Sequence, residues 1–214
     1  MARTVVESID QVTAWVQEHI CDHFRLKSPA DQHSAVGDVT LVTPRAYSMY
    51  LPQTDLDGSD DTVHPSVLVQ LLPSKDDPHV QREMQIRLSF TTYSIGTQEG
   101  ELYIPTDRPS DPDAGEVSGT FKKLEPEQWQ EPPYRRNEEG WRDAWNMIDR
   151  ALSEIEGSKQ IGPFRLDRTK GVEFGPYASD DDPIWTYYPY WGGWVTFSIT
   201  GETPRLNWEY YQDL

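Results

Sequence analysis

His19 and His23 stand four residues apart, the spacing that lets two imidazoles on one helix face share a zinc ion. A zinc protease also needs a glutamate directly after the first histidine, and this chain has Ile20 there. The other histidines fall in segments expected to be unrelated polar loops: His33, His64 and His79. We therefore expect His19 and His23 to be solvated or to cap a helix end, and we predict no metal or other cofactor.

Acidic residues alternate along Asp55–Asp61 in the manner of a calcium loop. The sixth position of that loop is Asp60, where a sharp turn needs glycine, and the twelfth is Ser66 instead of a bidentate glutamate. An EF-hand is therefore rejected. A looser cation site with the acids at 180–182 is an open alternative, although acidic runs are usually solvated loop tips.

An aromatic cluster precedes the last expected strand and offers rings that would stack on sugars: Trp185, Tyr187, Tyr188, Tyr190, Trp191 and Trp194. The interleaved Pro189 and Gly192-Gly193 fit equally well a tight turn whose rings pack on the core or on a neighbouring subunit. Carboxylate pairs for glycoside hydrolysis are recognised only by their separation across a cleft, so 36 acids are not evidence of one. No phosphate-binding glycine loop, nucleophile elbow or Cys/His constellation is present, and we predict no catalytic residue and no enzyme.

The composition excludes several other classes. The chain has 214 residues, and 19 Lys and Arg against 36 Asp and Glu give a net charge of −17. No basic cluster would follow a phosphate backbone, so direct nucleic-acid binding is not expected. The apolar runs are too short to cross a bilayer, the N-terminus lacks a signal-peptide pattern, and Cys21 is the only cysteine. We expect a soluble protein made in the cytosol and held together by ordinary packing.

The first half of the chain predicts a helix followed by strands. Thr4 and Glu7 have capping-box spacing, and apolar residues then recur every three or four positions, which predicts a helix over Thr4–Phe24. Residues 25–38 read as a connector. Val39–Leu51 is expected to be a strand, and Pro44 places it at a sheet edge, gives it a bulge or divides it in two.

Next comes an acidic loop, Gln53–His64, and then Ser66–Leu72, which is apolar enough to be a strand buried on both faces. Met84–Phe90 alternates apolar and polar residues and is predicted to be a half-buried strand. We expect these two strands to form an antiparallel hairpin at the centre of the sheet. The proline-rich segment Gly96–Arg136 shows no sustained periodicity and is expected to be an insertion, ordered on a partner or loose.

A second helix is expected from an N-cap at Asn137 to Gly157, with an apolar stripe made of Trp141, Trp145, Ile148, Leu152 and Ile155. Phe164–Phe174 and Trp191–Thr200 are predicted strands, the latter with Val195, Phe197 and Ile199 on one face. This order predicts one α+β domain over residues 1–214, with an antiparallel or mixed sheet of about five strands, two packed helices and the insertion at about 96–136.

Four segments come in an order that resembles the tail terminators of long-tailed bacteriophages that infect Gram-positive bacteria. They are the strand ending in Tyr50-Leu51-Pro52, the segment His64–Gln70 after the acidic loop, the helix Gly140–Ile148, and the Tyr188–Gly193 turn. The similarity covers roughly Thr40–Thr200 without the insertion, and none of these segments is catalytic. The insertion departs from the pattern of the tail terminators. The same segments would also fit another neck or tail-completion protein, which is an alternative identity within the class of structural tail proteins.

The resemblance implies a small α+β virion protein, assembled in the host cytoplasm, that forms a hexameric ring on the last ring of the tail tube and ends its growth. Its implied partners are other copies of itself, the major tail tube protein and the head-completion or stopper protein, with no nucleic acid and no membrane. A carbohydrate-binding module of a phage tail is the alternative from another class, and an acidic DNA mimic is a third. The expected partner surface consists of Asp57, Asp60, Asp61, Tyr103, Phe121, Trp129, Tyr188, Tyr190 and Trp191.

Overall fold

The computed structural model describes residues 4–29, 38–52, 63–77, 81–94, 102–105, 117–124, 140–178 and 189–202. The helices are α1 (Val5–His19) and α3 (Trp141–Gly157), with short 3₁₀ turns η1 (Cys21–His23) and η3 (Arg168–Lys170). The strands are β1 (Leu26–Pro29), β2 (Asp38–Val42), β3 (Arg45–Ser48), β4 (Ser66–Leu71), β5 (Lys75–Asp76), β6 (Arg82–Tyr93), β7 (Leu102–Pro105), β8 (Val117–Leu124), β9 (Gln160–Ile161), β10 (Phe164–Asp167), β11 (Glu173–Pro176) and β12 (Tyr190–Gly201).

The described strands form two sheets. The main sheet has eight strands in the order β3-β4-β6-β12-β10-β9, with β5 added beside β6 and β11 beside β12. All its described pairs are antiparallel except β3 with β4, so the sheet is mixed. The second sheet has four strands in the order β1-β2-β8-β7. The predicted α+β class, with two helices and a mixed sheet, is confirmed.

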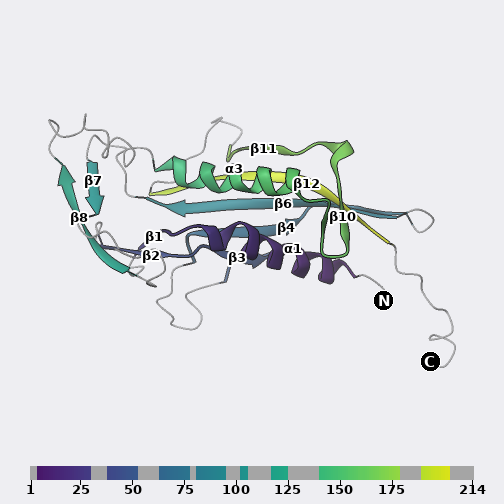
Figure 1. Cartoon of the computed structure of the whole chain (residues 1–214), viewed down its shortest axis with the longest axis horizontal. Coiled ribbons are helices and arrows are strands. Elements are labelled where there is room, and N and C mark those ends of the chain that lie inside the picture. The colour runs from purple at the N-terminus through teal and green to yellow at the C-terminus, as the bar shows by residue number, and fades with distance from the viewer. Residues whose placement is uncertain are drawn as a thin grey trace, which may run out of the picture.

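Both helices cover the same face of the main sheet (Figure 1). Helix α1 lies over β3 and β4, and α3 lies over β12 and β6. The strands beneath them alternate as predicted: Met84, Ile86, Leu88 and Phe90 of β6 are fully or almost fully buried, and the residues between them are only half-buried. The core is therefore a single layer of side chains between one sheet face and two helices.

Helix α1 begins as the capping pattern predicts, because the Thr4 hydroxyl accepts a hydrogen bond from the backbone N–H of Glu7 at 3.1 Å. Its buried face carries Ile9, Val12 and Val16. The predicted end at Phe24 is wrong, since α1 ends at His19 and a separate 3₁₀ turn follows. The expected connector after it contains strand β1, which was missed because its four residues show no clear alternation.

The strand predicted over Val39–Leu51 is divided into β2 and β3, one of the outcomes that Pro44 allowed. The two pieces belong to different sheets. The Gln17 side chain of α1 accepts a hydrogen bond from the Ala46 N–H at 2.9 Å and donates one to the Pro44 carbonyl at 3.2 Å. These bonds occupy backbone groups that the outer edge of β3 would otherwise leave open.

The predicted hairpin partners β4 and β6 do pair antiparallel, with Val67 opposite Phe90. They are not the centre of the sheet, however, because β6 pairs with β12 along its whole length, from Tyr93–Tyr190 to Arg82–Gly201. Strand β4 is also buried mainly on its helix-facing side, whereas burial on both faces was expected. The predicted strand over Phe164–Phe174 is divided by η3, so that β10 and β11 follow one another along the free edge of β12.

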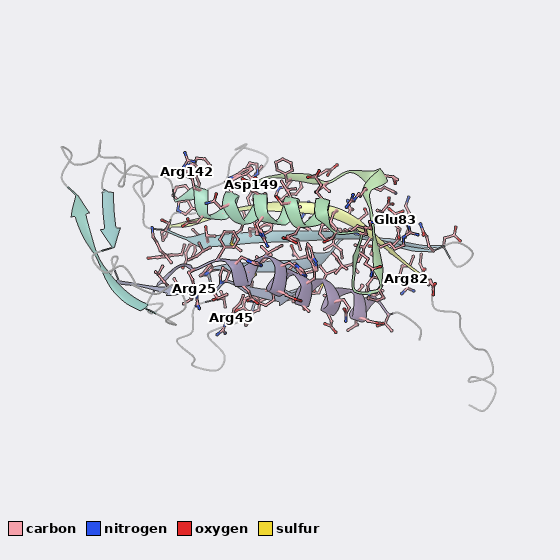
Figure 2. The ribbon with its side chains drawn as sticks, in the orientation of Figure 1. Arg25, Arg45, Arg82, Glu83, Arg142 and Asp149 are labelled. Atoms are coloured by element: carbon pink, nitrogen blue, oxygen red, sulfur yellow. The ribbon has the colours of Figure 1, made fainter. Side chains whose placement is uncertain are left out.

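Helix α3 is present where a helix was predicted, and its buried face overlaps the predicted stripe in Ile148 and Ile155, while Trp145 and Leu152 are partly buried at its border. Its N-cap is Gly140, and the proposed cap Asn137 lies outside the described residues. The buried residues are Ala144, Met147, Ile148, Ala151 and Ile155, whereas Trp141 keeps 42% of its surface exposed. Arg142 and Asp149 point away from the sheet (Figure 2). The stripe that includes Trp141, Trp145 and Leu152 is therefore a flank of the buried face.

The segment expected to be an insertion, Gly96–Arg136, contains two strands among its described residues. Strands β7 and β8 pair antiparallel, with Tyr103 opposite Lys123, and β8 pairs with β2. These strands lie beyond one end of the helix-covered sheet (Figure 1). No helix in the described ranges is long and apolar enough to span a membrane.

Candidate functional site

The root of the second sheet lies where β6 ends, β12 starts and α3 begins. Strand β1 packs beside β6 there, and Tyr190 of β12 is paired with Tyr93 of β6. Several polar and titratable side chains meet at this place. We call it the root site and define it by Lys27, Ser28, His64, Ser94, Asp143, Tyr190 and Trp191.

Lys27 and Asp143 bring opposite charges together inside the root site. Burial lowers the pKa of Lys27 and raises that of Asp143, and in each case the opposite charge of the other residue acts against this shift. The ammonium of Lys27 also donates a hydrogen bond to the Ser94 hydroxyl at 3.4 Å. The pair therefore connects β1 with the first turn of α3 and the end of β6.

His64 lies in the loop directly before β4, where a loop was expected, but its half-buried side chain belongs to the root site. Its Nδ1 is 3.0 Å from the Ser66 hydroxyl, and its ring meets that of Tyr190 edge-on at 5.1 Å. Its backbone carbonyl accepts a hydrogen bond from the Ser28 hydroxyl of β1 at 2.8 Å. Burial lowers the pKa of His64 to about 4, so the ring is neutral at pH 7.

The described members of the aromatic cluster pack within the chain. Tyr190 also contacts Tyr93 edge-on at 5.5 Å, and the Trp191 indole N–H donates to the Ser94 carbonyl at 2.9 Å. A side chain at Gly140 would meet that indole nitrogen at 2.7 Å, so α3 starts directly against it. The Arg87 guanidinium lies over the Trp194 ring at 4.9 Å. These rings form part of the packing between strands and helix rather than an open row for stacking on sugars.

The expected partner surface is only partly visible. Tyr190 and Trp191 are brought together in the root site, and Tyr103 and Phe121 are placed in β7 and β8 of the second sheet. The remaining predicted interface residues and the two acidic runs lie outside the described residues: Asp55, Asp57, Asp60, Asp61, Trp129, Tyr188 and Asp180–Asp182.

The two histidines considered as zinc ligands lie on different elements, because α1 ends at His19 and His23 belongs to η1. The His19 ring stacks on Trp15 at 5.5 Å, and its Nδ1 is 3.5 Å from the Glu154 carboxylate of α3. Within the described part of the chain, no three His, Cys, Asp or Glu side chains gather closely enough to hold a metal ion.

The root site is better suited to holding elements together than to catalysis. Burial lowers the pKa of Lys27, although the charge of Asp143 opposes that shift, so the protonation of Lys27 does not decide between the two roles. Ser94 is only 1% exposed, so a substrate would not reach its hydroxyl without a rearrangement. The arrangement joins β1 of the second sheet to the end of β6, to the residues before β4 and to the first turn of α3.

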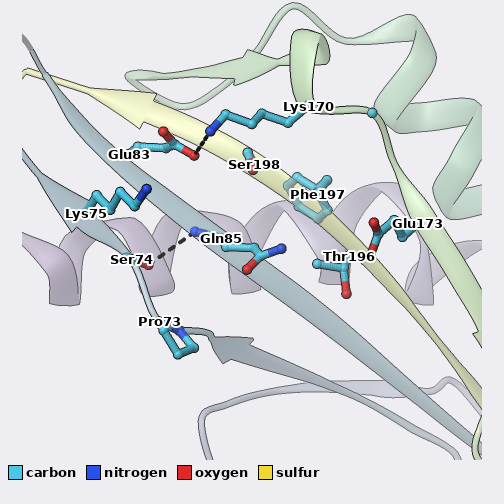
Figure 3. Close-up of a pocket in the computed structure, with 11 residues that line it drawn as sticks. Pro73, Ser74, Lys75, Glu83, Gln85, Lys170, Glu173, Thr196, Phe197 and Ser198 are labelled. Carbon is cyan, nitrogen blue, oxygen red and sulfur yellow. Dashed lines mark hydrogen bonds and ion pairs between the residues drawn. The ribbon is translucent and has the colours of Figure 1, made fainter.

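The helix-free face of the main sheet carries a shallow cavity of about 240 Å³ (Figure 3). Its floor includes the hydroxyl-bearing Thr196 and Ser198 of β12, and Lys170 reaches over them to Glu83 of β6 at 2.7 Å. Lys75 forms one of its walls and Glu173 another. The face is polar and close to balanced in charge, which suits an antiparallel sheet with one side toward water.

Sequence reasoning missed Lys27 and Asp143, and it took His64 for a residue of an unrelated loop, although its ring contacts Tyr190. The sequence around Asp143 gives one local indication of a role, because an acidic residue in the first turn of a helix is favoured by the helix dipole. No local pattern pairs it with a lysine in a distant strand. No family model, no curated protein and no solved structure matches this chain.

Proposed function

We propose that this chain is a structural subunit of a bacteriophage tail that acts by assembly: it forms a ring on the end of the tail tube, ends tube growth and joins the tube to head-completion proteins. It has no catalytic role in this proposal. The proposal starts from the resemblance carried by the segments around Tyr50–Pro52, His64–Gln70, Gly140–Ile148 and Tyr188–Gly193.

One observation supports it best. Strands β7 and β8 of the second sheet lie beyond the end of the helix-covered sheet, and among the described strands β7 is the last of that sheet (Figure 1). An outer strand presents backbone N–H and C=O groups that another chain can pair with or cover. A monomer with a projecting sheet therefore has a surface suited to a neighbouring subunit.

The root site supports the same role, because it holds this sheet in one direction. Lys27 and Ser28 of β1 bind groups of the main sheet, at Ser94 and at the His64 carbonyl. A contact element held rigidly loses less conformational entropy when its partner binds than a loose one does. The net charge of −17 also suits a ring through which DNA must pass without being held.

The test is electron microscopy of tails assembled with and without the protein. Tubes of uncontrolled length in its absence, and a ring of added density at the tube end in its presence, are the expected results. Tubes of normal length that fail to join heads would instead assign the protein to neck completion.

Two further measurements address the alternatives from other classes. Calorimetry against host cell-wall glycans should give no saturable heat, because the described aromatic rings pack within the chain. Saturable binding that is lost in Trp191→Ala, without loss of folding, would favour a carbohydrate-binding module. Turnover of a glycan or peptide library that one carboxylate substitution abolishes would refute the non-enzymatic role.

A further inference from the structure

The cavity on the helix-free face of the main sheet has a floor made by β6 and β12 and a wall on each side (Figure 3). One wall is β5, which follows the turn at Pro73 and Ser74, and the other is the start of β11 after η3. Its volume of about 240 Å³ is below the range of sites for drug-sized molecules, so the cavity suits a small ligand.

Ser198 is a buried polar residue of the floor whose hydroxyl has no partner in the part of the chain that the structure describes. The residue is 5% exposed, and its hydroxyl forms no hydrogen bond there. Among the described residues, every fully enclosed side-chain oxygen or nitrogen has a partner, so the Ser198 hydroxyl opens into the cavity. An open hydroxyl of this kind bonds either water or a ligand.

Gln85 adds an amide to the same floor. It is paired with Ser198 across β6 and β12, so the two side chains lie on one face, and Figure 3 shows the amide pointing over the floor toward Thr196. The Thr196 hydroxyl accepts a hydrogen bond from Arg87 at 3.4 Å and can still donate its own hydrogen. The floor therefore offers donors and acceptors side by side, as a ligand peptide group with its N–H and C=O requires.

Opposite charges stand on the two walls. Lys75 of β5 and Glu173 of β11 both point toward the floor (Figure 3), and neither side chain forms an ion pair or a hydrogen bond with a residue that the structure describes. Lys75 lies opposite Glu83 in the sheet, but the Glu83 carboxylate binds Lys170 at 2.7 Å. The other charged residues around the cavity are also bound within the chain: Arg87 over the Trp194 ring, Asp167 to Thr169, and Asp76 to Arg82.

These charges cancel, which disfavours a simple anion or a simple cation as the ligand. The two charges left for a ligand have opposite signs and stand on opposite walls. A ligand with a negative group at one end and a positive group at the other complements them.

The strand register places the polar floor groups between the two charges. The Gln85–Ser198 pair lies halfway along β6 between the position opposite Lys75 and the position in line with Glu173. With about 4.8 Å between neighbouring strands and about 3.4 Å per residue, the Cα atoms of Lys75 and Glu173 are roughly 20 Å apart along a diagonal. Their side chains span part of this distance and leave a gap that a peptide of about three extended residues would fill.

We infer that this cavity binds a short zwitterionic peptide with free termini. The peptide carboxylate binds Lys75, the peptide ammonium binds Glu173, and the peptide groups between them bond the Ser198 hydroxyl and the Gln85 amide. The cavity is separate from the root site, and the inference does not rest on the proposed assembly into a ring.

Titration of the intact chain with trialanine, followed by NMR of the backbone amides, tests the inference. The amide signals of Gln85 and Ser198 should shift saturably, with a dissociation constant on the order of 1 mM, because both charged contacts are solvent-exposed. N-acetyl-trialanine lacks the ammonium and trialanine amide lacks the carboxylate. Each should bind more weakly than trialanine by roughly threefold or more.

Substitutions in the cavity assign each end of the peptide. Lys75→Met should weaken trialanine to the level of its amide, and Glu173→Gln should weaken it to the level of the acetylated peptide. Ser198→Ala should weaken all three peptides alike. The matched controls, Lys159→Met and Glu18→Gln, remove the same charges at exposed positions that do not line the cavity, and should leave binding unchanged.

Three results would overturn the inference. They are the absence of a saturable shift up to roughly 50 mM trialanine, equal binding of the three peptides by the unaltered protein, and shifts confined to other parts of the chain. None of them bears on ring formation. Conversely, tail tubes that carry no ring would overturn the proposed function and leave this binding site in place.

Discussion

Lys27 of β1 and Asp143 in the first turn of α3 hold opposite charges together in a site that is largely removed from water. Lys27 belongs to the second sheet, whereas Asp143 belongs to a helix that covers the main sheet. Their attraction offsets part of the cost of burying either charge alone. We therefore expect the position of the second sheet to depend on both residues.

Replacing one member of this pair should cost more than replacing both. Lys27→Met leaves Asp143 without its counter-charge and should lower the free energy of unfolding by about 2 kcal/mol, less than for a fully buried pair because both side chains keep some contact with water. Adding Asp143→Asn should recover part of that loss. Urea unfolding followed by tryptophan fluorescence measures both, and strictly additive effects would contradict the coupling.

His64 should make stability depend on pH in a defined window. Its pKa falls from 6.5 in the unfolded chain to about 4 in the folded protein, so its contribution is complete above pH 6.5 and is lost as the pH falls toward 4. The loss attributable to this residue is up to about 3 kcal/mol. Unfolding curves for the native protein and for His64→Gln should therefore converge as the pH falls through this window.

The control is the same substitution at an exposed histidine, His23→Gln. An unchanged pH profile in His64→Gln would mean that folding does not shift the pKa of His64.

Gly192 should not tolerate a side chain. A Cβ there would lie 2.4 Å from the Tyr177 ring and 2.5 Å from the Phe90 carbonyl, and the backbone atom cannot move without distorting β6. Gly192→Ala should destabilise the protein by about 3 kcal/mol. Gly157→Ala is the matched control, because nothing lies within 4 Å of its added Cβ, and it should change stability by less than about 1 kcal/mol. Thermal unfolding distinguishes the two, and equal effects would show that crowding at Gly192 is not the cause.

Cys21 should react with thiol reagents only when the protein unfolds. It is fully buried, and burial raises its pKa to about 12, so almost no thiolate forms near neutral pH. We expect the rate of labelling by a chromogenic disulfide reagent to follow the unfolding rate across a urea series. Rapid labelling without urea would mean that η1 opens separately from the rest of the fold.

Sequence alone determined the elements whose signal is local. The strict alternation from Met84 to Phe90 predicted a half-buried strand, and Val195, Phe197 and Ile199 share the buried face of β12 as expected. Period and capping are properties of neighbouring residues, so they can be read before any partner is known. The α+β class follows from the order of these elements.

Only the tertiary structure decided which face of α3 is buried. The sequence analysis chose the buried face of the helix by its most hydrophobic residues, among them Trp141 and Trp145. The helix packs instead through a face that includes Ala144 and Ala151, whose small side chains let it approach β12 closely. At that contact an added Cβ on Gly193 would lie 2.9 Å from the Ile148 side chain. The tryptophans are too large for this space and lie on the flank instead.

The root site could not have been read from the sequence either. Lys27 sits in a four-residue strand without periodicity, and its partner Asp143 lies far along the chain in a helix. A charge pair depends on the distance between the two side chains in space, and the residues next to either one in the sequence give no sign of its partner. The sequence thus predicted the long helices and strands with a clear period, while the packing of β1 beside β6 determined that these two charges meet.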